Sequence, residues 1–346
     1  DPAGPDDPEN GLLGIQYIGE NDSLHAPLRV TAAYGQDRIY RHTDLQALPP
    51  GTYATVGQDV VGWEFDTVFD NGHTPEGLEI LAATPVYGVL LRDAGDYKVS
   101  ATGETTTTLT RYTAPSGAIV LSAGTNQWSW GLGARQAEAI APDPLIAQIT
   151  YNILADMGMQ PATPGDGLIL DGEDGSLPVD PDAIFPLDAP NDIVIENVQV
   201  HHPTGDLLND GRTVTITWET TVPTAGQLWF GRTPELINVE RGHVRAFTRD
   251  HALTEINLIP GDIIYYQILA VDERGRLAVY DGHFQTPPNL LVQGGSAILN
   301  ALRAGRCWSQ ANPTLATAGG LALALVITLA AGRALASLRR RLKRGR

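Results

Sequence analysis

The sequence predicts three parts: a partial α/β layer, an all-β sandwich and one C-terminal transmembrane helix. Three observations support this division. Short apolar runs between turn residues fill residues 11–125 and are followed by an amphipathic helix, alternating strands fill residues 193–287, and an uncharged apolar segment precedes an arginine-rich end. With 346 residues the chain has room for two ordinary domains and an anchor.

The first 160 residues are expected to form the α/β part. Residues 1–11 are rich in proline and aspartate and read as an irregular lead-in. Six runs then have the length and β-branched or aromatic content of strands, at 11–19, 28–34, 59–69, 78–86, 105–114 and 118–125. The last run is apolar almost throughout, which is typical of a strand covered on both faces.

A helix is predicted over residues 143–158. Asp143 suits the N-cap, Pro144 suits the first helical position and Gly158 suits the end. One apolar face is made by residues three and four apart: Ile146, Ile149, Ile153 and Met157. A strand, a loop and a helix laid back on the sheet are expected at the edge of an α/β layer.

Three blocks in this part resemble a known family. VVGWEFDTVFDNGHTPEGLEILAATPV, YTAPSGAIVLSAGTNQWSWGLG and LIAQITYNILADMG resemble the C-terminal part of the N,N-dimethylformamidase large (beta) subunit-like domain, over about residues 10–160. The resemblance implies a glutamine-amidotransferase-like α/β fold that continues upstream. It also implies hydrolysis of an amide at an iron held by tyrosine and glutamate. The resemblance implies that those ligands lie upstream of Asp1, and no motif matches Tyr17, Tyr34, Tyr40, Tyr53 or Glu64 to them.

The candidate ligand-binding stretch follows the last predicted strand of this part. Open α/β sheets bind ligands at the carboxyl ends of their strands. Asn126, Gln127 and Ser129 offer hydrogen bonds to a small polar ligand, and Trp128 and Trp130 offer walls. Alternatively, the tryptophans close the edge of the domain and the amides satisfy the loop backbone.

No complete catalytic site is predicted, and no metal-binding residue is assigned. Glu64 and Asp66 share one face of a strand and suit acid–base work, although an exposed sheet face explains them equally well. G-x-S-x-G, H-E-x-x-H and paired-cysteine motifs are absent from the sequence. The single cysteine, Cys307, excludes an intrachain disulfide framework.

Residues 161–192 form an acidic linker rich in proline and glycine. Its carboxylates are Asp166, Asp171, Glu173, Asp174, Asp180, Asp182 and Asp188. Such loops can hold calcium, and a solvated linker is the alternative. No other cofactor is expected in this chain. Iron is expected only if the upstream part of the family's domain exists.

Residues 193–288 are expected to form an antiparallel sandwich. Six or seven short strands alternate in polarity, with Trp218 in the core and Ile264, Tyr266 and Ile268 on one face. The stretch resembles a fibronectin type III domain, closest to the variety that precedes purple acid phosphatase catalytic domains. That resemblance implies a spacer or docking module.

The C-terminal end predicts a membrane anchor. A juxtamembrane segment at 289–312 leads into a transmembrane helix at 313–338, and a buried core helix is the alternative. The anchoring residues are Leu315, Leu321, Leu323, Leu325, Val326, Ile327 and Leu329. A basic tail at 339–346 follows, and the residues that place it inside are Arg333, Arg339, Arg340, Arg341, Lys343, Arg344 and Arg346.

These expectations place the chain in the plasma membrane as a single-pass protein with its N-terminal domains outside and its tail in the cytoplasm. The lipid bilayer is the expected partner, with other membrane or surface proteins, and a net charge of −17 argues against nucleic acid. The predicted function is a membrane-anchored extracytoplasmic binding or scaffold protein without a complete catalytic site. The alternative is the C-terminal part of an iron-dependent amidohydrolase, a hydrolase of non-peptide C–N bonds whose catalytic residues lie upstream or in a partner.

Overall fold

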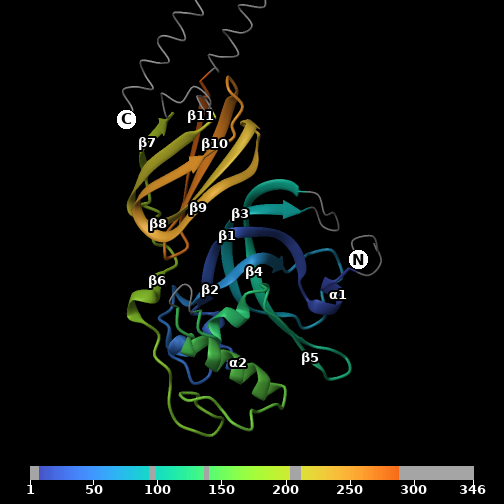
Figure 1. The fold of residues 1–346 in the computed structure, drawn as a ribbon. Coiled ribbons are helices and arrows are strands. Elements are labelled where there is room, and N and C mark those ends of the chain that lie inside the picture. The colour runs from blue at the N-terminus through green and yellow to red at the C-terminus, as the bar shows by residue number, and fades with distance from the viewer. Residues whose placement is uncertain (1–7, 93–98, 136–139, 203–211, 288–346) are drawn as a thin grey trace, which may run out of the picture.

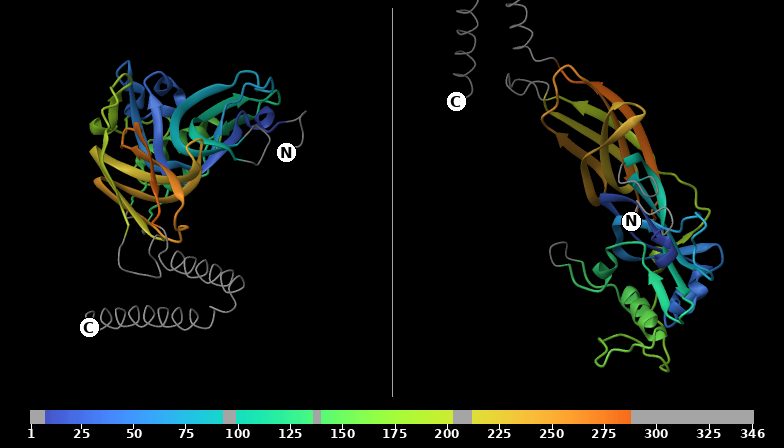
Figure 2. Two further views of the ribbon diagram at one scale, coloured as in Figure 1. Left: turned by 90° about the horizontal axis from the view of Figure 1, so that it is seen from above. Right: turned by 90° about the vertical axis from the view of Figure 1, so that its right-hand side faces the viewer.

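Two antiparallel sheets make up the described part of the chain, which a computed structural model defines for residues 8–92, 99–135, 140–202 and 212–287. The second sheet follows the first end to end, and the main helix lies at the opposite end of the first sheet (Figures 1 and 2). The first sheet has the order β5-β4-β3-β1-β2-β6. The second has the order β11-β10-β8-β7, with β9 also paired to β8.

The elements have the following bounds. The first sheet contains β1 (Gln16–Thr31), β2 (Thr52–Thr67), β3 (Glu79–Arg92), β4 (Val99–Thr113), β5 (Ile119–Ser122) and β6 (Ile184–Pro186). The second contains β7 (Ile195–His201), β8 (Val214–Thr233), β9 (Leu236–Glu255), β10 (Ile263–Val271) and β11 (Leu277–Gln285). The α-helices are α1 (Asn10–Leu13) and α2 (Pro144–Asp156), and short 3-10 turns are η1 (Tyr34–Gln36), η2 (Arg38–Tyr40), η3 (Asp44–Ala47), η4 (Trp128–Gly131) and η5 (Pro181–Ala183).

The predicted α/β layer is wrong. Every named strand pairing of the first sheet is antiparallel, so none of these pairs forms the parallel unit of an α/β layer. The misleading signal was the apolar run 118–125. It forms β5, a four-residue edge strand that pairs only with β4 and is half-buried along its length. This apolar run therefore lies at the edge of the sheet. Hydrophobicity alone does not distinguish such an edge strand from a central one.

Helix α2 closes the core of the first sheet, as its sequence pattern predicts. Ile146 and Ile149 are fully buried against Val60 and Phe65, and Ile153 is buried beside them. The Asp143 carboxylate caps the helix, accepting from the N–H groups of Leu145 at 2.8 Å and Ile146 at 3.1 Å. Its second oxygen accepts from Gly57 N–H at 2.9 Å, so the cap also ties the helix to β2.

The acidic segment 161–192 is attached to the first sheet along much of its length. Arg41 pairs with Asp171 at 2.7 Å, and the buried Gln148 amide bonds both the N–H and the C=O of Ile169 at 2.9 Å. Residues 184–186 then join the sheet as β6, beside β2. The segment therefore leads the chain along a fixed path to the second sheet.

Strands β8 and β9 bend, so that the second sheet folds over its own core. The first half of β8 pairs with β7 and with the end of β9, whereas its second half pairs with β10 and with the start of β9. The register shifts between Glu219 and Thr224, where the bend occurs. Trp218, Tyr266 and Ile268 are buried between the two halves, as the alternation of the sequence predicts.

The prediction of a membrane anchor is contradicted. Within the described ranges, no helix is long and apolar enough to cross a bilayer. The expected transmembrane helix at 313–338, its juxtamembrane segment and its basic tail lie outside the residues that the structure describes. The single-pass plasma-membrane location and the membrane-anchored scaffold function thus have no structural support.

Replacing Asp143 with alanine should lower the free energy of unfolding by about 1–2 kcal/mol, because the helix loses its cap and β2 loses its bond to that cap. Urea unfolding followed by circular dichroism measures this loss. The exposed Asp188 provides the matched control, and Asp188→Ala should change stability by less than about 0.5 kcal/mol. An equal effect of the two substitutions would show that the cap does not stabilise the fold.

Candidate functional site

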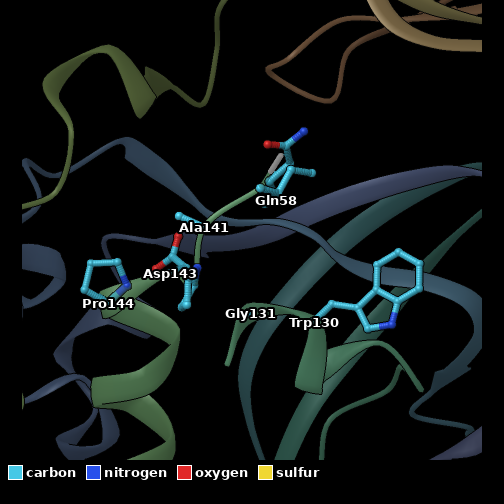
Figure 3. Close-up of a pocket in the computed structure, with 8 residues that line it drawn as sticks. Gln58, Trp130, Gly131, Ala141, Asp143 and Pro144 are labelled. Atoms are coloured by element: carbon cyan, nitrogen blue, oxygen red, sulfur yellow. The ribbon is translucent and has the colours of Figure 1, made fainter. Parts of the chain in front are cut away.

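A hollow of about 290 Å³ opens between η4 and the start of α2. Figure 3 shows Gln58 at one rim, the Trp130 indole at another, and Asp143 and Pro144 beside the helix start. The residues that line it are Gln58, Trp130, Gly131, Ile140, Ala141, Pro142, Asp143 and Pro144. They come from β2, from η4 and from the approach to α2, so tertiary contacts alone bring them together.

Gly131 fixes the position of η4 against the helix. A Cβ atom at this residue would lie 2.6 Å from Ile146 Cγ2, so only glycine permits the observed packing. The backbone N–H of Asp143 donates to Gly131 C=O at 2.8 Å and holds the two segments together. The hollow is therefore bounded by the same contacts that cap α2.

The five residues of the predicted ligand-binding stretch have different surroundings. Trp130 lines the hollow, and Asn126 and Ser129 are exposed. Gln127 is buried, with its amide 3.4 Å from His25 Nε2, and Trp128 packs on the core of the first sheet and donates to Thr150 Oγ1 at 3.0 Å. The structure thus brings only Trp130 of the five to the hollow.

Residues that the sequence did not single out surround Trp130. The Arg135 guanidinium lies 4.6 Å from the indole centroid and pairs with Asp59 at 3.2 Å. His25 meets the indole edge-on at 5.5 Å. Burial and the nearby charge of Arg245 lower the pKa of His25 to about 4, so its imidazole is neutral at physiological pH. Asp59 has φ +58°, and this left-handed conformation in the middle of β2 gives no signal in the sequence.

The hollow is suited to binding rather than to acid–base catalysis. Both Asp143 oxygens already accept backbone hydrogen bonds, and the other lining side chains are apolar or amide. None of the eight lining residues is a serine, a cysteine or a histidine that could serve as nucleophile or base. The carboxylate also occupies the positive end of α2, which disfavours an anionic ligand.

A separate cluster of carboxylates lies on β1 and β2. The strand register places Tyr17 opposite Asp66, and Glu20 opposite Glu64. Burial, with the charges of Glu9 and Glu64, raises the pKa of Asp66 to about 6. Glu20 is paired with Arg92 and accepts from the Tyr17 hydroxyl at 3.2 Å. The surroundings of Asp66 thus shift its acidity towards neutral pH.

Three of the tyrosines considered as iron ligands, Tyr17, Tyr40 and Tyr53, have hydroxyls that donate hydrogen bonds within the fold. The Tyr17 hydroxyl donates to Glu20, and burial and the Glu20 charge raise its pKa to about 12. The hydroxyls of Tyr40 and Tyr53 donate to backbone carbonyls, and burial raises the pKa of both phenols. Glu64 is exposed, and the described residues include no group of three histidine, cysteine or carboxylate side chains placed to hold a metal.

The acidic segment likewise uses some of its carboxylates within the fold. The hydrogen bond from Arg41 lowers the pKa of Asp171, Glu173 accepts from Leu170 N–H and Asp180 caps η5. Calcium binding in this segment therefore stays a prediction without a preformed cage among the residues described.

Asp66 should make stability depend on pH. Its folded pKa of about 6 exceeds the ordinary value of 3.8, so the folded state holds the proton more tightly than the unfolded state does. Stability should therefore fall as pH rises from about 4 to about 6. Asp66→Asn should remove this dependence and gain about 1–2 kcal/mol at pH 7.5.

Chemical denaturation at pH 4.5 and pH 7.5 measures the Asp66 contribution, with Asp70→Asn, at an exposed residue, as the control. The prediction is contradicted if wild type and Asp66→Asn differ by the same free energy at both pH values.

Comparison with known proteins agrees with the sequence resemblance. The family described as "N,N-dimethylformamidase beta subunit-like, C-terminal" matches residues 2–140. No curated protein matches the chain. Among solved structures, one titled "Structure of FN3tt mut" is similar at 15% identity, covering 25% of this chain and 90% of that chain with a TM-score of 0.19. That score supports no argument about fold. Residues 2–140 of this chain are thus similar to the C-terminal domain of the N,N-dimethylformamidase beta subunit-like family.

Proposed function

We propose that this chain is the accessory, C-terminal part of an amide hydrolase of the dimethylformamidase type. The match over residues 2–140 is the observation that carries the proposal. In this role the two sheets support and orient the catalytic part of the enzyme, and the reacting groups and any iron belong to another region or subunit.

The hydrogen bonds that the polar side chains make within the fold support this proposal. The hydroxyls of Tyr40, Tyr53 and Tyr87 donate to backbone carbonyls. The buried amides of Gln148 and Asn152 hold the 39–41 and 169 backbone segments. These groups stabilise the fold and are protonated or already bonded, so they are poorly suited to act on a substrate.

The test measures iron and amide hydrolysis on the purified full chain. Elemental analysis after incubation with Fe²⁺ and Fe³⁺ should find far less than one iron per chain, and N,N-dimethylformamide should not be hydrolysed. Tyr17→Phe and Glu20→Gln should leave both results unchanged. One tightly bound iron that either substitution removes, or hydrolysis that either abolishes, would place the catalytic centre in this chain and overturn the proposal.

A second candidate function is the binding of a small neutral amide in the hollow beside Trp130. The cavity and its indole wall favour it, and the Asp143 carboxylate argues against anions. On titration with N,N-dimethylformamide, the Trp130 indole N–H signal in NMR spectra should shift with saturation. Trp130→Ala should abolish the remaining shifts around Gly131, whereas Trp63→Ala, at an indole that is 51% exposed elsewhere on β2, should not. Linear shifts without saturation in every tryptophan signal would show solvent effects only.

A further inference from the structure

We propose that the two sheets form one rigid body that unfolds as a unit, held by a seam between β1–β3 of the first sheet and β8–β11 of the second. The inference is independent of the proposed function. Its evidence is an apolar cluster, a buried amide pair, a glycine at close approach and two tyrosines that clamp a turn.

The apolar cluster lies on the outer face of the second sheet. The pairing of β8 with β10 puts Gln227 and Trp229 on the same face as Leu269, opposite to the side chains of the sandwich core. Trp229 is 1% exposed and Leu269 is 4% exposed, because Leu24 and Leu90 of the first sheet cover them. Burying a tryptophan and a leucine in this way stabilises the contact between the two sheets.

The amide pair sets the register of the seam. Gln227 Nε2 donates to Asn21 Oδ1 at 3.0 Å, and Asn21 Nδ2 donates to Gly88 C=O at 3.0 Å and Tyr87 C=O at 2.7 Å. Both amide side chains are almost fully buried. A buried amide without its partner is costly, so the sheets cannot slide past each other while they stay in contact.

Gly88 permits the close approach of β3 to the second sheet. Its φ of +60° lies in the left-handed region, and an added Cβ would collide with Gln227 Oε1 and lie 2.8 Å from Leu269 Cδ1. A side chain at this residue would therefore push the two sheets apart.

The turn between β10 and β11 is clamped by two tyrosines of the first sheet. Tyr53 Oη donates to Arg274 C=O at 2.9 Å, and Tyr87 Oη donates to Gly275 C=O at 2.9 Å. The turn is itself rigid, because the Asp272 carboxylate accepts from the N–H groups of Arg274 at 3.0 Å and Arg276 at 2.9 Å.

Aromatic and cationic side chains extend the clamp to β6. The Arg29 guanidinium lies 4.0 Å from the Tyr53 ring centroid, the Tyr53 and Phe185 rings are 5.5 Å apart, and the Arg274 guanidinium lies 5.1 Å from the Phe185 ring. Both cation–π contacts and aromatic ring pairs stabilise partly desolvated sites. The seam thus joins β1, β2, β6 and the β10–β11 turn.

A rigid seam changes the role expected of the second sheet. The sequence resemblance implies a spacer or docking module that follows an acidic linker. With the seam in place, any partner meets both sheets in a single relative orientation.

Gly88→Ala tests the seam in the full chain, with Gly77→Ala as its matched control. Both glycines have positive φ, but a Cβ at Gly77 would meet open space. Hydrogen exchange should show that the slowest amides of both wild-type sheets open together. Gly88→Ala should lower the protection of β8 and β10 at least tenfold more than that of β1 and β2, and Gly77→Ala should not separate the sheets. Identical patterns in the two variants would overturn the proposal.

A milder pair of substitutions keeps the test valid if Gly88→Ala fails to fold. The double variant Tyr53→Phe/Tyr87→Phe removes only the two clamp hydroxyls. Tyr40→Phe removes a hydroxyl that donates to Leu81 C=O within the first sheet and serves as the control. The clamp variant should lose the common opening of the two sheets, and the control should keep it. Wild-type sheets that already open separately would also contradict the proposal.

Discussion

The outer face of the second sheet cannot remain in water, and its cover by the first sheet is the constraint on which the arrangement of the molecule depends. A sandwich that stands alone would expose Trp229, Leu269 and the Gln227 amide on one face. The chain covers them with Leu24, Leu90 and Asn21, and this requires a backbone without a side chain at Gly88. Residues 161–192 contribute to the same contact, because their strand β6 lies next to the clamped β10–β11 turn.

Several polar side chains in the first half of the chain are buried and bond to other parts of the fold. Asp143 caps the start of α2, Gln148 and Asn152 lie within the helix, and each makes several hydrogen bonds to backbone groups. Gln127 and Trp128, which follow β5, are also held within the fold. The Gln127 amide lies against His25, and the Trp128 indole donates to Thr150. Polar residues after an apolar strand signal a ligand site and a buried loop equally well, and burial decides between them.

Local features of the fold were readable from the sequence, whereas the layout of the sheets was not. The N-cap at Asp143, the buried face of α2 and the core position of Trp218 follow from spacing and capping chemistry. The strand order of the first sheet does not follow from the sequence, because the apolar strand β5 lies at the edge of the sheet. The lining of the hollow was also hidden, since Gln58 and Pro142 meet only after β2 and α2 have packed.

Charge pairing completes the picture of an acidic chain with few basic residues. Arg111 binds both Asp37 and Glu79, Arg41 binds Asp156 and Asp171, and Arg276 binds Asp272 and Asp192. Each of these arginines joins segments distant in sequence or closes a turn, and each is largely shielded from solvent. Shielded, multiply bonded pairs outlast exposed ones in salt. Arg41, Arg111 and Arg276 therefore tie segments of the described fold together.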